Sequence, residues 1–318
     1  MLLSSVAESM LWSGRYVERA QGLARAVHAV ERVSLDLPGR NALGLRPLLS
    51  LVASAPRLTG PESDPAAQLH ALVLNGDDAS SVFGALSAAR ENLRQARVVV
   101  PPELWAALND QYQRMKAATD QPLARVLDAL AAVLQGGSRV EGEARTSMER
   151  DAAYCFFQLG IQIERADLQL RLLSVLLPAL APRGWERTFD DVRWAGLLEA
   201  LGLLSMYRRR HHHNADLPLL LQFALSDMAC PRSVVHCLRL VGEELGMLPR
   251  AGLARAALSV ATNLAFGLSH AEPEAVAEHI DSTLAALAKL HAALQDSYFP
   301  ESAPVECAPE PTAEDART

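Results

Sequence analysis

Two short segments of the sequence place a Glu-Arg dipeptide in closely similar helical surroundings. Residues Gly14–Ala20 read Gly-Arg-Tyr-Val-Glu-Arg-Ala, and residues Gly160–Ala166 read Gly-Ile-Gln-Ile-Glu-Arg-Ala. Both segments lie in apolar stretches, where an unpaired charge costs several kcal/mol. The charges therefore need partners of opposite sign or a ligand. The dipeptides at 18–19 and 164–165 are the first candidates for chemistry in this chain.

The simplest way to neutralise these four charges is to pair the two dipeptides with each other. If the helices that carry them pack antiparallel, Glu18 meets Arg165 and Arg19 meets Glu164, each through a bidentate ion pair. This arrangement has two interpretations. It is either an internal salt-bridge network that fixes the register of the helices, or an incompletely neutralised pocket whose arginines receive a carboxylate or a phosphate.

Two further groups of charges are candidates for the same pocket. The segment Arg90–Arg94 places two arginines one helical turn apart, and like charges at that spacing favour an acidic partner from elsewhere. Arg232 lies at an expected helix start, where the helix dipole and free amides attract anions. A solvated face is the alternative for both groups. The candidate binding residues are therefore Glu18, Arg19, Arg90, Glu91, Arg94, Glu164, Arg165 and Arg232.

No other motif in the sequence indicates catalysis or a metal. The run Arg208–His213 contains three consecutive histidines, but neighbours on a helix point about 100° apart and do not converge on one ion. The cysteines, Cys155, Cys230, Cys237 and Cys307, form no CxxC pair and match no zinc-site spacing. We find no phosphate-binding loop, dinucleotide fingerprint, or hydrolase or zinc-protease signature. The sequence therefore predicts no metal and no cofactor, and leaves the catalytic residues unknown.

Composition and charge exclude several classes of partner. The chain has 318 residues, of which 30 are basic and 37 acidic, for a formal net charge of −7. Because five acids lie in the last 18 residues, residues 1–300 carry only about −3, which gives no reason to expect nucleic acid or an anionic membrane as a partner. The cysteine usage is typical of a reducing compartment, and neither a signal peptide nor a membrane-spanning segment is visible. We predict a cytoplasmic protein.

Helical periodicity dominates the whole chain, and no stretch alternates in the manner of a β-strand. The fold class is therefore predicted as all-α, a multi-helix bundle. Helices are expected at about 5–32, 79–100, 103–118, 122–136, 146–177, 188–210, 217–226, 231–248, 252–268 and 274–299, with short helical turns near 45–53. Capping boxes are expected to start two of them, at Ser5-x-x-Glu8 and Thr146-x-x-Glu149, and Gly136-Gly137 is expected to end another.

These elements predict one helical domain, residues 1–300, followed by an acidic tail, residues 301–318, that is too poor in apolar residues to fold. The 146-residue offset between the two Glu-Arg helices suggests that the domain consists of two related halves, about 1–138 and 139–300. Long amphipathic helices from each half need each other's apolar stripes. Both halves are therefore expected to pack as one bundle.

Several segments together resemble the alpha-E domain family, which is named for its helices and its Glu-Arg motif. The resemblance rests on Arg15–Ala20, Ala89–Arg94, Ile163–Asp167, Met206–Arg209 and Pro231–Val234, and it covers nearly all of residues 1–300 in the same order. The family's second frame usually reads Gly-Arg-Tyr-Leu-Glu-Arg-Ala-Asp. This chain departs from it by an isoleucine and a glutamine at 161–162, which argues against a fully symmetric pair of sites.

The resemblance implies a cytoplasmic bacterial helical protein without an established activity, often encoded beside, or fused to, circularly permuted ATP-grasp amide ligases and transglutaminase-like peptidases. We therefore expect an accessory module that binds a peptide or acidic intermediate and works with such a ligase and peptidase in peptide or amide metabolism. A second hypothesis is an enzyme with Glu18 or Glu164 as general base for amide transfer or hydrolysis, which predicts a raised glutamate pKa. A third is a purely structural scaffold with a buried Glu-Arg network.

Overall fold

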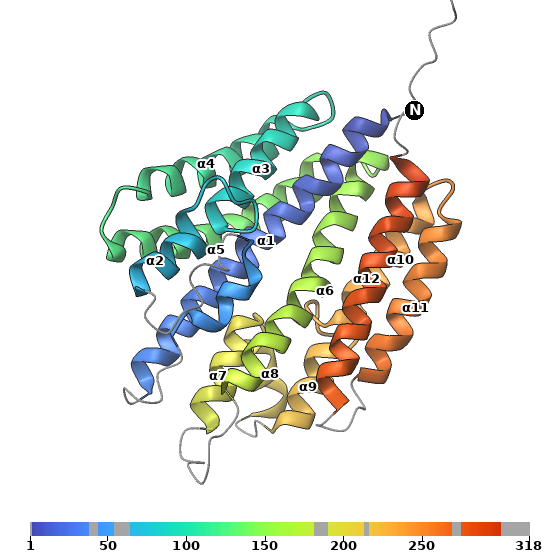
Figure 1. The fold of residues 1–318 in the computed structure, drawn as a ribbon. Coiled ribbons are helices and arrows are strands. Elements are labelled where there is room, and N and C mark those ends of the chain that lie inside the picture. The colour runs from blue at the N-terminus through green and yellow to red at the C-terminus, as the bar shows by residue number, and fades with distance from the viewer. Residues whose placement is uncertain are drawn as a thin grey trace, which may run out of the picture.

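The computed structural model describes residues 2–37, 44–53, 64–180, 190–212, 216–268 and 275–299, and every regular element in these ranges is helical, as predicted (Figure 1). No helix in these ranges combines the length and apolar character needed to cross a bilayer. The expected tail, residues 301–318, lies outside them. The elements are α1 (Ser4–Asp36), η2 (Arg46–Leu51), α2 (Pro65–Leu69), η4 (His70–Leu74), α3 (Val82–Gln95), α4 (Pro102–Ala118), α5 (Leu123–Ser147), α6 (Ala152–Leu180), α7 (Asp190–Ala200), α8 (Leu204–His211), α9 (Leu217–Leu225), α10 (Val234–Met247), α11 (Gly252–Leu268) and α12 (Val276–Tyr298).

The two long helices α1 and α6 lie side by side at the centre of the bundle (Figure 1). Gly14 faces the backbone of Phe157. About two helical turns further along α1, Gly22 faces the side chain of Leu168. Residue numbers therefore rise together along both helices, so the pair is parallel. The antiparallel arrangement considered from the sequence is wrong.

Two glycines set the distance between these helices. A Cβ on Gly14 would lie 2.1 Å from the carbonyl oxygen of Phe157, and a Cβ on Gly160 would lie 2.0 Å from that of Leu11. Any larger residue would push the backbones apart, so the close approach requires glycine at both positions. The same two glycines open the repeated segments, and the charged residues that follow them are consequently brought into contact.

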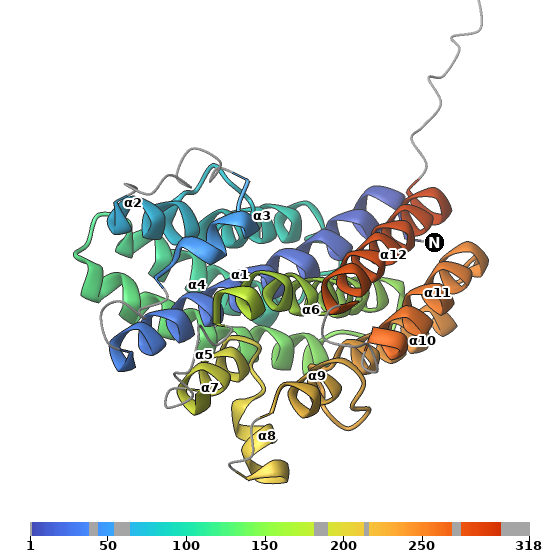
Figure 2. The ribbon, with the colours of Figure 1, turned by 60° about the horizontal axis from the view of Figure 1, so that its bottom comes forward.

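Each long helix carries a similar set of shorter helices (Figures 1 and 2). α3 packs on α1 and α10 packs on α6, while α4 pairs with α5 and α11 pairs with α12. Helices α3 and α10 both have 14 residues, and α4 and α11 both have 17. Ser81 and Ser233 cap α3 and α10, and each hydroxyl also donates to a carbonyl six residues earlier, that of Asn75 or Asp227. The relation between the two halves stays a prediction from the sequence.

The starts of α1 and α6 differ from the predicted capping boxes. α1 begins with Ser4 and no side chain caps it, so the box expected at Ser5 does not form. Thr146 lies in the last turn of α5, where it cannot begin a helix. Asp151 accepts a hydrogen bond from the amide of Tyr154 at the start of α6 instead. Both predicted capping boxes are therefore wrong.

Two predictions that concern glycines are also wrong. One pair of glycines expected to end a helix lies within it, and another glycine interrupts a helix expected to be continuous. α5 continues through Gly136 and Gly137 and across the expected boundary between the halves, because the missing side chains leave room for the buried amides of Gln111 and Gln21. Gly202 instead divides the helix expected to run to residue 210. Its φ of 72° lies in the left-handed region that favours glycine, and it separates α7 from α8. The part of that expected helix before residue 190 lies outside the described ranges.

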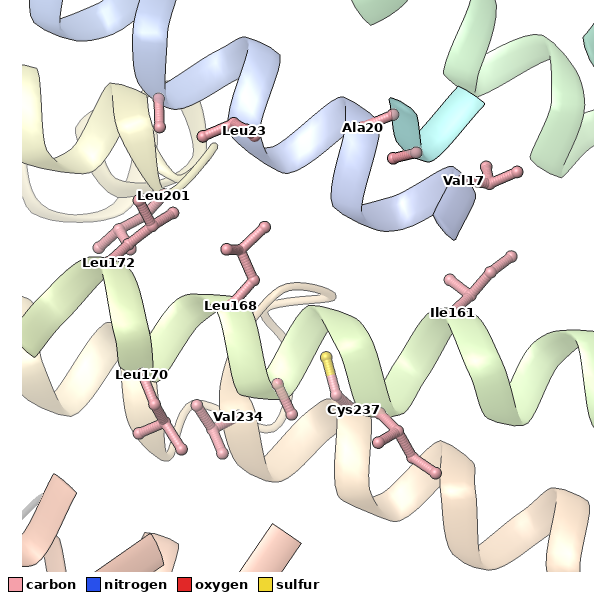
Figure 3. Packing of buried hydrophobic residues seen from close by; sticks show 14 of the residues in the cluster. Val17, Ala20, Leu23, Ile161, Leu168, Leu170, Leu172, Leu201, Val234 and Cys237 are labelled. Carbon is pink, nitrogen blue, oxygen red and sulfur yellow. The ribbon is translucent and has the colours of Figure 1, made fainter. Parts of the chain in front are cut away.

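One continuous apolar core joins the central helices to α10 (Figure 3). Val17 and Leu23 of α1 lie opposite Ile161 and Leu168 of α6, and Cys237 of α10 lies on the other side of α6. The Glu-Arg dipeptides occur on the same turns as these side chains. Their charges are therefore placed in a medium where electrostatic interactions are strong and desolvation is costly.

Candidate ligand-binding site

The carboxylate of Glu18 is the centre of a closed ion-pair group. It accepts hydrogen bonds from Nη2 of Arg165 at 2.7 Å and from Nη1 of Arg232 at 2.9 Å. Arg165 also donates to Glu141 of α5 at 3.1 Å. The Glu18 side chain is only 2% exposed, so protein groups rather than water compensate its charge. We call Glu18, Glu141, Arg165 and Arg232 the Glu18 centre.

Electrostatic pairing keeps the Glu18 carboxylate ionised. Burial alone would raise the pKa of Glu18, but the positive charges of Arg165 and Arg232 outweigh this effect and hold the pKa at about 2. Burial likewise favours the neutral form of Arg165, yet the charge of Glu18 raises the pKa of that guanidinium. A stable ion pair is the result.

Sequence reasoning missed Arg25, which follows Glu18 by two helical turns on the same face of α1. Arg25 forms no hydrogen bond or ion pair with any described residue. Burial and the neighbouring charge of Arg232 lower the pKa of Arg25 to about 9, so the guanidinium is still charged at neutral pH. The spacing of seven residues from Glu18 is the sequence signal that could have indicated it.

Glu164 is the centre of a second ion-pair group. Its carboxylate accepts hydrogen bonds from Nε of Arg15 at 2.7 Å and from Nε of Arg19 at 2.5 Å. The Glu164 side chain is 3% exposed, whereas those of Arg15 and Arg19 are 11% and 23% exposed. Burial alone would raise the pKa of Glu164, but the two arginine charges outweigh it and lower the pKa. We call Arg15, Arg19 and Glu164 the Glu164 centre.

Aromatic rings of α1 support the two arginines of the Glu164 centre. The guanidinium of Arg15 lies over the ring of Trp12 at 5.2 Å, and that of Arg19 over the ring of Tyr16 at 5.3 Å. The two rings stack with their centroids 5.5 Å apart. A ring and the Glu164 carboxylate together therefore orient each arginine before any ligand arrives.

The Glu164 centre opens onto a cleft of about 340 Å³ between α1, η2, α6 and the turn before α3. An ion pair between Arg171 and Asp167, with Nε and Oδ2 2.6 Å apart, forms part of its wall. The cleft is lined by Arg15, Arg19, Leu23, Ser50, Leu51, Val52, Ala53, Ser80, Glu164, Asp167, Leu168 and Arg171. Three of these residues are cations and two are anions, which leaves one surplus positive charge.

The arginines of this cleft retain unused donors. Arg15 and Arg19 each donate to Glu164 through Nε, and their terminal nitrogens have no acceptor among the described residues. A guanidinium binds a planar carboxylate through two parallel N–H groups, and terminal nitrogens supply such donors. The arrangement suits an anionic group that enters from the cleft.

The structure does not bring Arg90, Glu91 and Arg94 to either centre. Nε of Arg90 donates to Asn109 of α4 at 2.8 Å, and its guanidinium lies over the ring of Tyr112 at 4.8 Å. Glu91 and Arg94 pair with each other on an exposed part of α3. The prediction that these three residues line the polar cleft is therefore wrong, because the face of α3 that carries them meets α4 and solvent.

The reciprocal pairing predicted for the two dipeptides is present, but each of these pairs has a single hydrogen bond, so the predicted bidentate geometry is wrong. Glu18 meets Arg165 and Glu164 meets Arg19, although each carboxylate also has a further arginine as partner. The general-base hypothesis required a raised glutamate pKa, and both glutamates have a lowered one. Within the described ranges, no group of three or more His, Cys, Asp or Glu side chains is placed to hold a metal ion.

A family model accounts for nearly the whole chain. Residues 2–299 match Alpha-E, described as a predicted alpha-helical domain with a conserved ER motif. The chain belongs to the Alpha-E family. In this Alpha-E protein, two Glu-Arg dipeptides that fit the description supply the central carboxylates of both ion-pair groups.

Curated relatives of this Alpha-E chain are longer proteins. The chain is 23% identical to the uncharacterized protein Mb2597 of Mycobacterium bovis and to the uncharacterized protein Rv2567 of Mycobacterium tuberculosis. Each match covers 92% of this chain and 36% of the relative, so the chain spans about a third of their length. No solved structure matches the Alpha-E chain.

Proposed function

We propose that this Alpha-E chain is a non-catalytic accessory module that binds the carboxylate of a peptide or acidic intermediate in the cleft of the Glu164 centre. One observation carries the proposal. Glu164 and two aromatic rings orient Arg15 and Arg19, yet the terminal nitrogens of both arginines have no acceptor among the described residues. Donors that are held in place but unused are what a carboxylate-binding site requires.

The charge and shape of the cleft favour a carboxylate on an aliphatic or peptide body. One carboxylate would neutralise the single surplus positive charge of the lining residues. Leu23, Leu51 and Leu168 form an apolar part of the wall, which would contact the chain beside the carboxylate. A cleft of about 340 Å³ holds the end of a peptide rather than a folded surface.

The partners are proposed from the family resemblance. An ATP-grasp amide ligase and a transglutaminase-like peptidase make and cut amide bonds, and both handle peptides with free carboxylates. A module that holds a carboxylate end would present such a peptide to either enzyme. The longer curated relatives, of which this chain spans 36%, have room for further domains beside the Alpha-E region.

Isothermal titration calorimetry with paired peptides tests the binding proposal. A short peptide with a free C-terminal carboxylate should bind the wild-type chain, and the same peptide with an amidated end should bind at least about tenfold more weakly, equivalent to 1.4 kcal/mol. Arg19→Gln should lose the preference, and Arg94→Gln, which changes an exposed pair elsewhere, should keep it. Equal binding of both peptides to the wild type would refute the carboxylate site.

Co-purification tests the partner proposal separately. The tagged chain, co-expressed with a circularly permuted ATP-grasp ligase, should retain it, and Arg19→Gln should not affect that complex if docking uses a different surface. Absence of any complex, with carboxylate binding intact, would remove the proposed partner and leave the proposed ligand.

A further inference from the structure

A pair of arginines beside the Glu18 centre has no part in the function proposed above. The side chains of Arg25 and Arg232 come from α1 and from the turn before α10, and they approach each other across Gly202. A Cβ built on Gly202 would lie 3.1 Å from Cδ of both arginines, so these two carbon atoms are at most about 6 Å apart. The two charges repel each other, because the charge of Arg232 helps to lower the pKa of Arg25.

The surrounding charges do not balance. Within the described part of the chain, Glu18 and Glu141 provide two negative charges, and Arg25, Arg165 and Arg232 provide three positive ones. Arg165 and Arg232 hydrogen bond to these carboxylates, whereas Arg25 has no acceptor. One cation is therefore left without a counter-charge.

A second donor in the same group is also unpartnered. Arg165 is 5% exposed, and its Nε is buried with no hydrogen-bond partner. A buried donor that makes no hydrogen bond costs about 1–3 kcal/mol. Together with Arg25, it shows that the protein does not satisfy this arginine group by itself.

Solvent reaches the unpaired cation. The Arg25 residue is partly exposed, whereas Glu18 beside it is buried. Gly202 adopts a φ of 72° and leaves both arginine side chains free to pass on its open side. The side chain of Arg25 is therefore less enclosed than the carboxylate of Glu18.

We propose that Arg25 and Arg232 form a binding site for a phosphate-type oxyanion, either inorganic phosphate or the phosphate group of a small monoester. Two arginine side chains on separate elements approach the same glycine, and a tetrahedral oxyanion has enough acceptors to receive donors from both. A single negative charge on the ligand would neutralise the surplus, and a second would also offset the exposed Arg145 that pairs with Glu141.

Thermal unfolding in phosphate and in chloride at matched ionic strength tests the site. Phosphate should raise the midpoint of the wild-type chain by several degrees more than chloride, because a ligand that binds the folded state stabilises it. Arg25→Gln should abolish the difference, and Arg94→Gln should retain it. A wild-type midpoint that responds equally to both salts, or an unchanged phosphate response in Arg25→Gln, would overturn the proposal.

One further variant and one further ligand complete the test. Arg25→Lys keeps the charge but loses the planar fork, so it should bind phosphate about tenfold more weakly; it also serves if Arg25→Gln does not fold. Glycerol phosphate in place of inorganic phosphate distinguishes the two sources: a larger stabilisation by the monoester indicates a metabolite, and an equal or smaller one indicates the free ion. Arg19→Gln, which changes the Glu164 centre, should keep the phosphate response, and this separates the site from carboxylate binding there.

Discussion

The Glu18 centre and the Glu164 centre begin from the same dipeptide and end in different environments. On α1, Arg15 precedes the dipeptide by one turn and gives Glu164 its second cation. The equivalent position on α6 is Ile161, so Glu18 takes its second cation from Arg232 before α10. A repeated motif therefore supplies the carboxylate, while the neighbouring elements decide whether the site is closed.

The turns before α3 and α10 explain why one centre is open. Arg232 directly precedes Ser233, the cap of α10, and its side chain closes the Glu18 centre. Ser80 directly precedes Ser81, the cap of α3, and lines the cleft beside the Glu164 centre. The Ser80 hydroxyl accepts a hydrogen bond from the amide of Ala53 and donates one to Asp78 instead of Glu164, and a cleft remains beside that carboxylate. The residue before the helix cap, rather than the identity of the motif, distinguishes the Glu18 centre from the Glu164 centre.

Removal of the Glu18 charge should have the largest effect on stability. Glu18→Gln leaves Arg165 and Arg232 without their carboxylate, beside the unpaired Arg25, so the free energy of unfolding should fall by about 3–5 kcal/mol. Urea denaturation with an unchanged m-value measures this. A loss no larger than that of Glu164→Gln would contradict the division into a closed and an open centre.

Low pH should reduce the difference in unfolding free energy between the wild type and Glu18→Gln. The folded pKa of Glu18 is about 2, below the ordinary value of 4.5, so its charge stabilises the fold above pH 4.5 and the contribution is lost as the pH falls toward 2. Between pH 6 and pH 3 the wild type should lose roughly 2 kcal/mol through this group, and the variant should not. Unfolding curves at pH 6 and pH 3 test this. If the unfolding free energies of the two proteins differ by the same amount at both pH values, the cost of the substitution is not electrostatic.

Substitution of either glycine at the contact between α1 and α6 should destabilise the protein. Both ion-pair centres depend on this contact. Gly14→Ala and Gly160→Ala place a methyl group against a carbonyl oxygen of the other helix, and each should cost about 2–3 kcal/mol. Gly142→Ala in α5 is the matched control: nothing lies within 4 Å of its Cβ position. That variant should gain about 0.5–1 kcal/mol from helix propensity. Similar midpoints for all three variants would show that the close approach is not required.

The Glu164 charge should matter least for stability and most for binding. Glu164→Gln removes the carboxylate that orients Arg15 and Arg19, but water in the cleft can solvate these partly exposed cations. The unfolding free energy should fall by about 1–2 kcal/mol, less than for Glu18→Gln. Calorimetry on the same variant should show weakened discrimination between free and amidated peptides. Unchanged peptide binding would mean that Glu164 does not orient the arginines.

Helical content and the pairing of Glu18 with Arg165 could be predicted because they follow from local patterns. Apolar spacing of three and four residues defines helices, and buried opposite charges on two such helices have few alternatives to each other. Helix ends were less predictable. Gly136 lies within α5, whereas Gly202 lies between α7 and α8 with a φ of 72°, and the sequence does not show which glycine adopts that conformation.

The candidate site shows the same division. Arg90 and Arg94 carry charges at suitable helical spacing, yet they face α4 and solvent, because the orientation of α3 depends on contacts between distant parts of the chain. Arg25 has no motif around it and gains its significance only from Arg232 and Gly202, which lie far from it in the sequence. The spacing of residues along a helix shows which side chains share a face. It does not show which other element, or solvent, contacts that face.

By itself, the amino-acid sequence determined that this protein is helical, that it contains two buried Glu-Arg dipeptides, and that these pair reciprocally. Only the tertiary structure decided that the central helices are parallel, that Arg232 closes the Glu18 centre, and that Ser80 leaves the Glu164 centre open. The physical reason is the range of the interactions. Periodicity and the cost of burying a charge act on each segment locally, whereas the partner and the exposure of an arginine depend on helices brought together by packing.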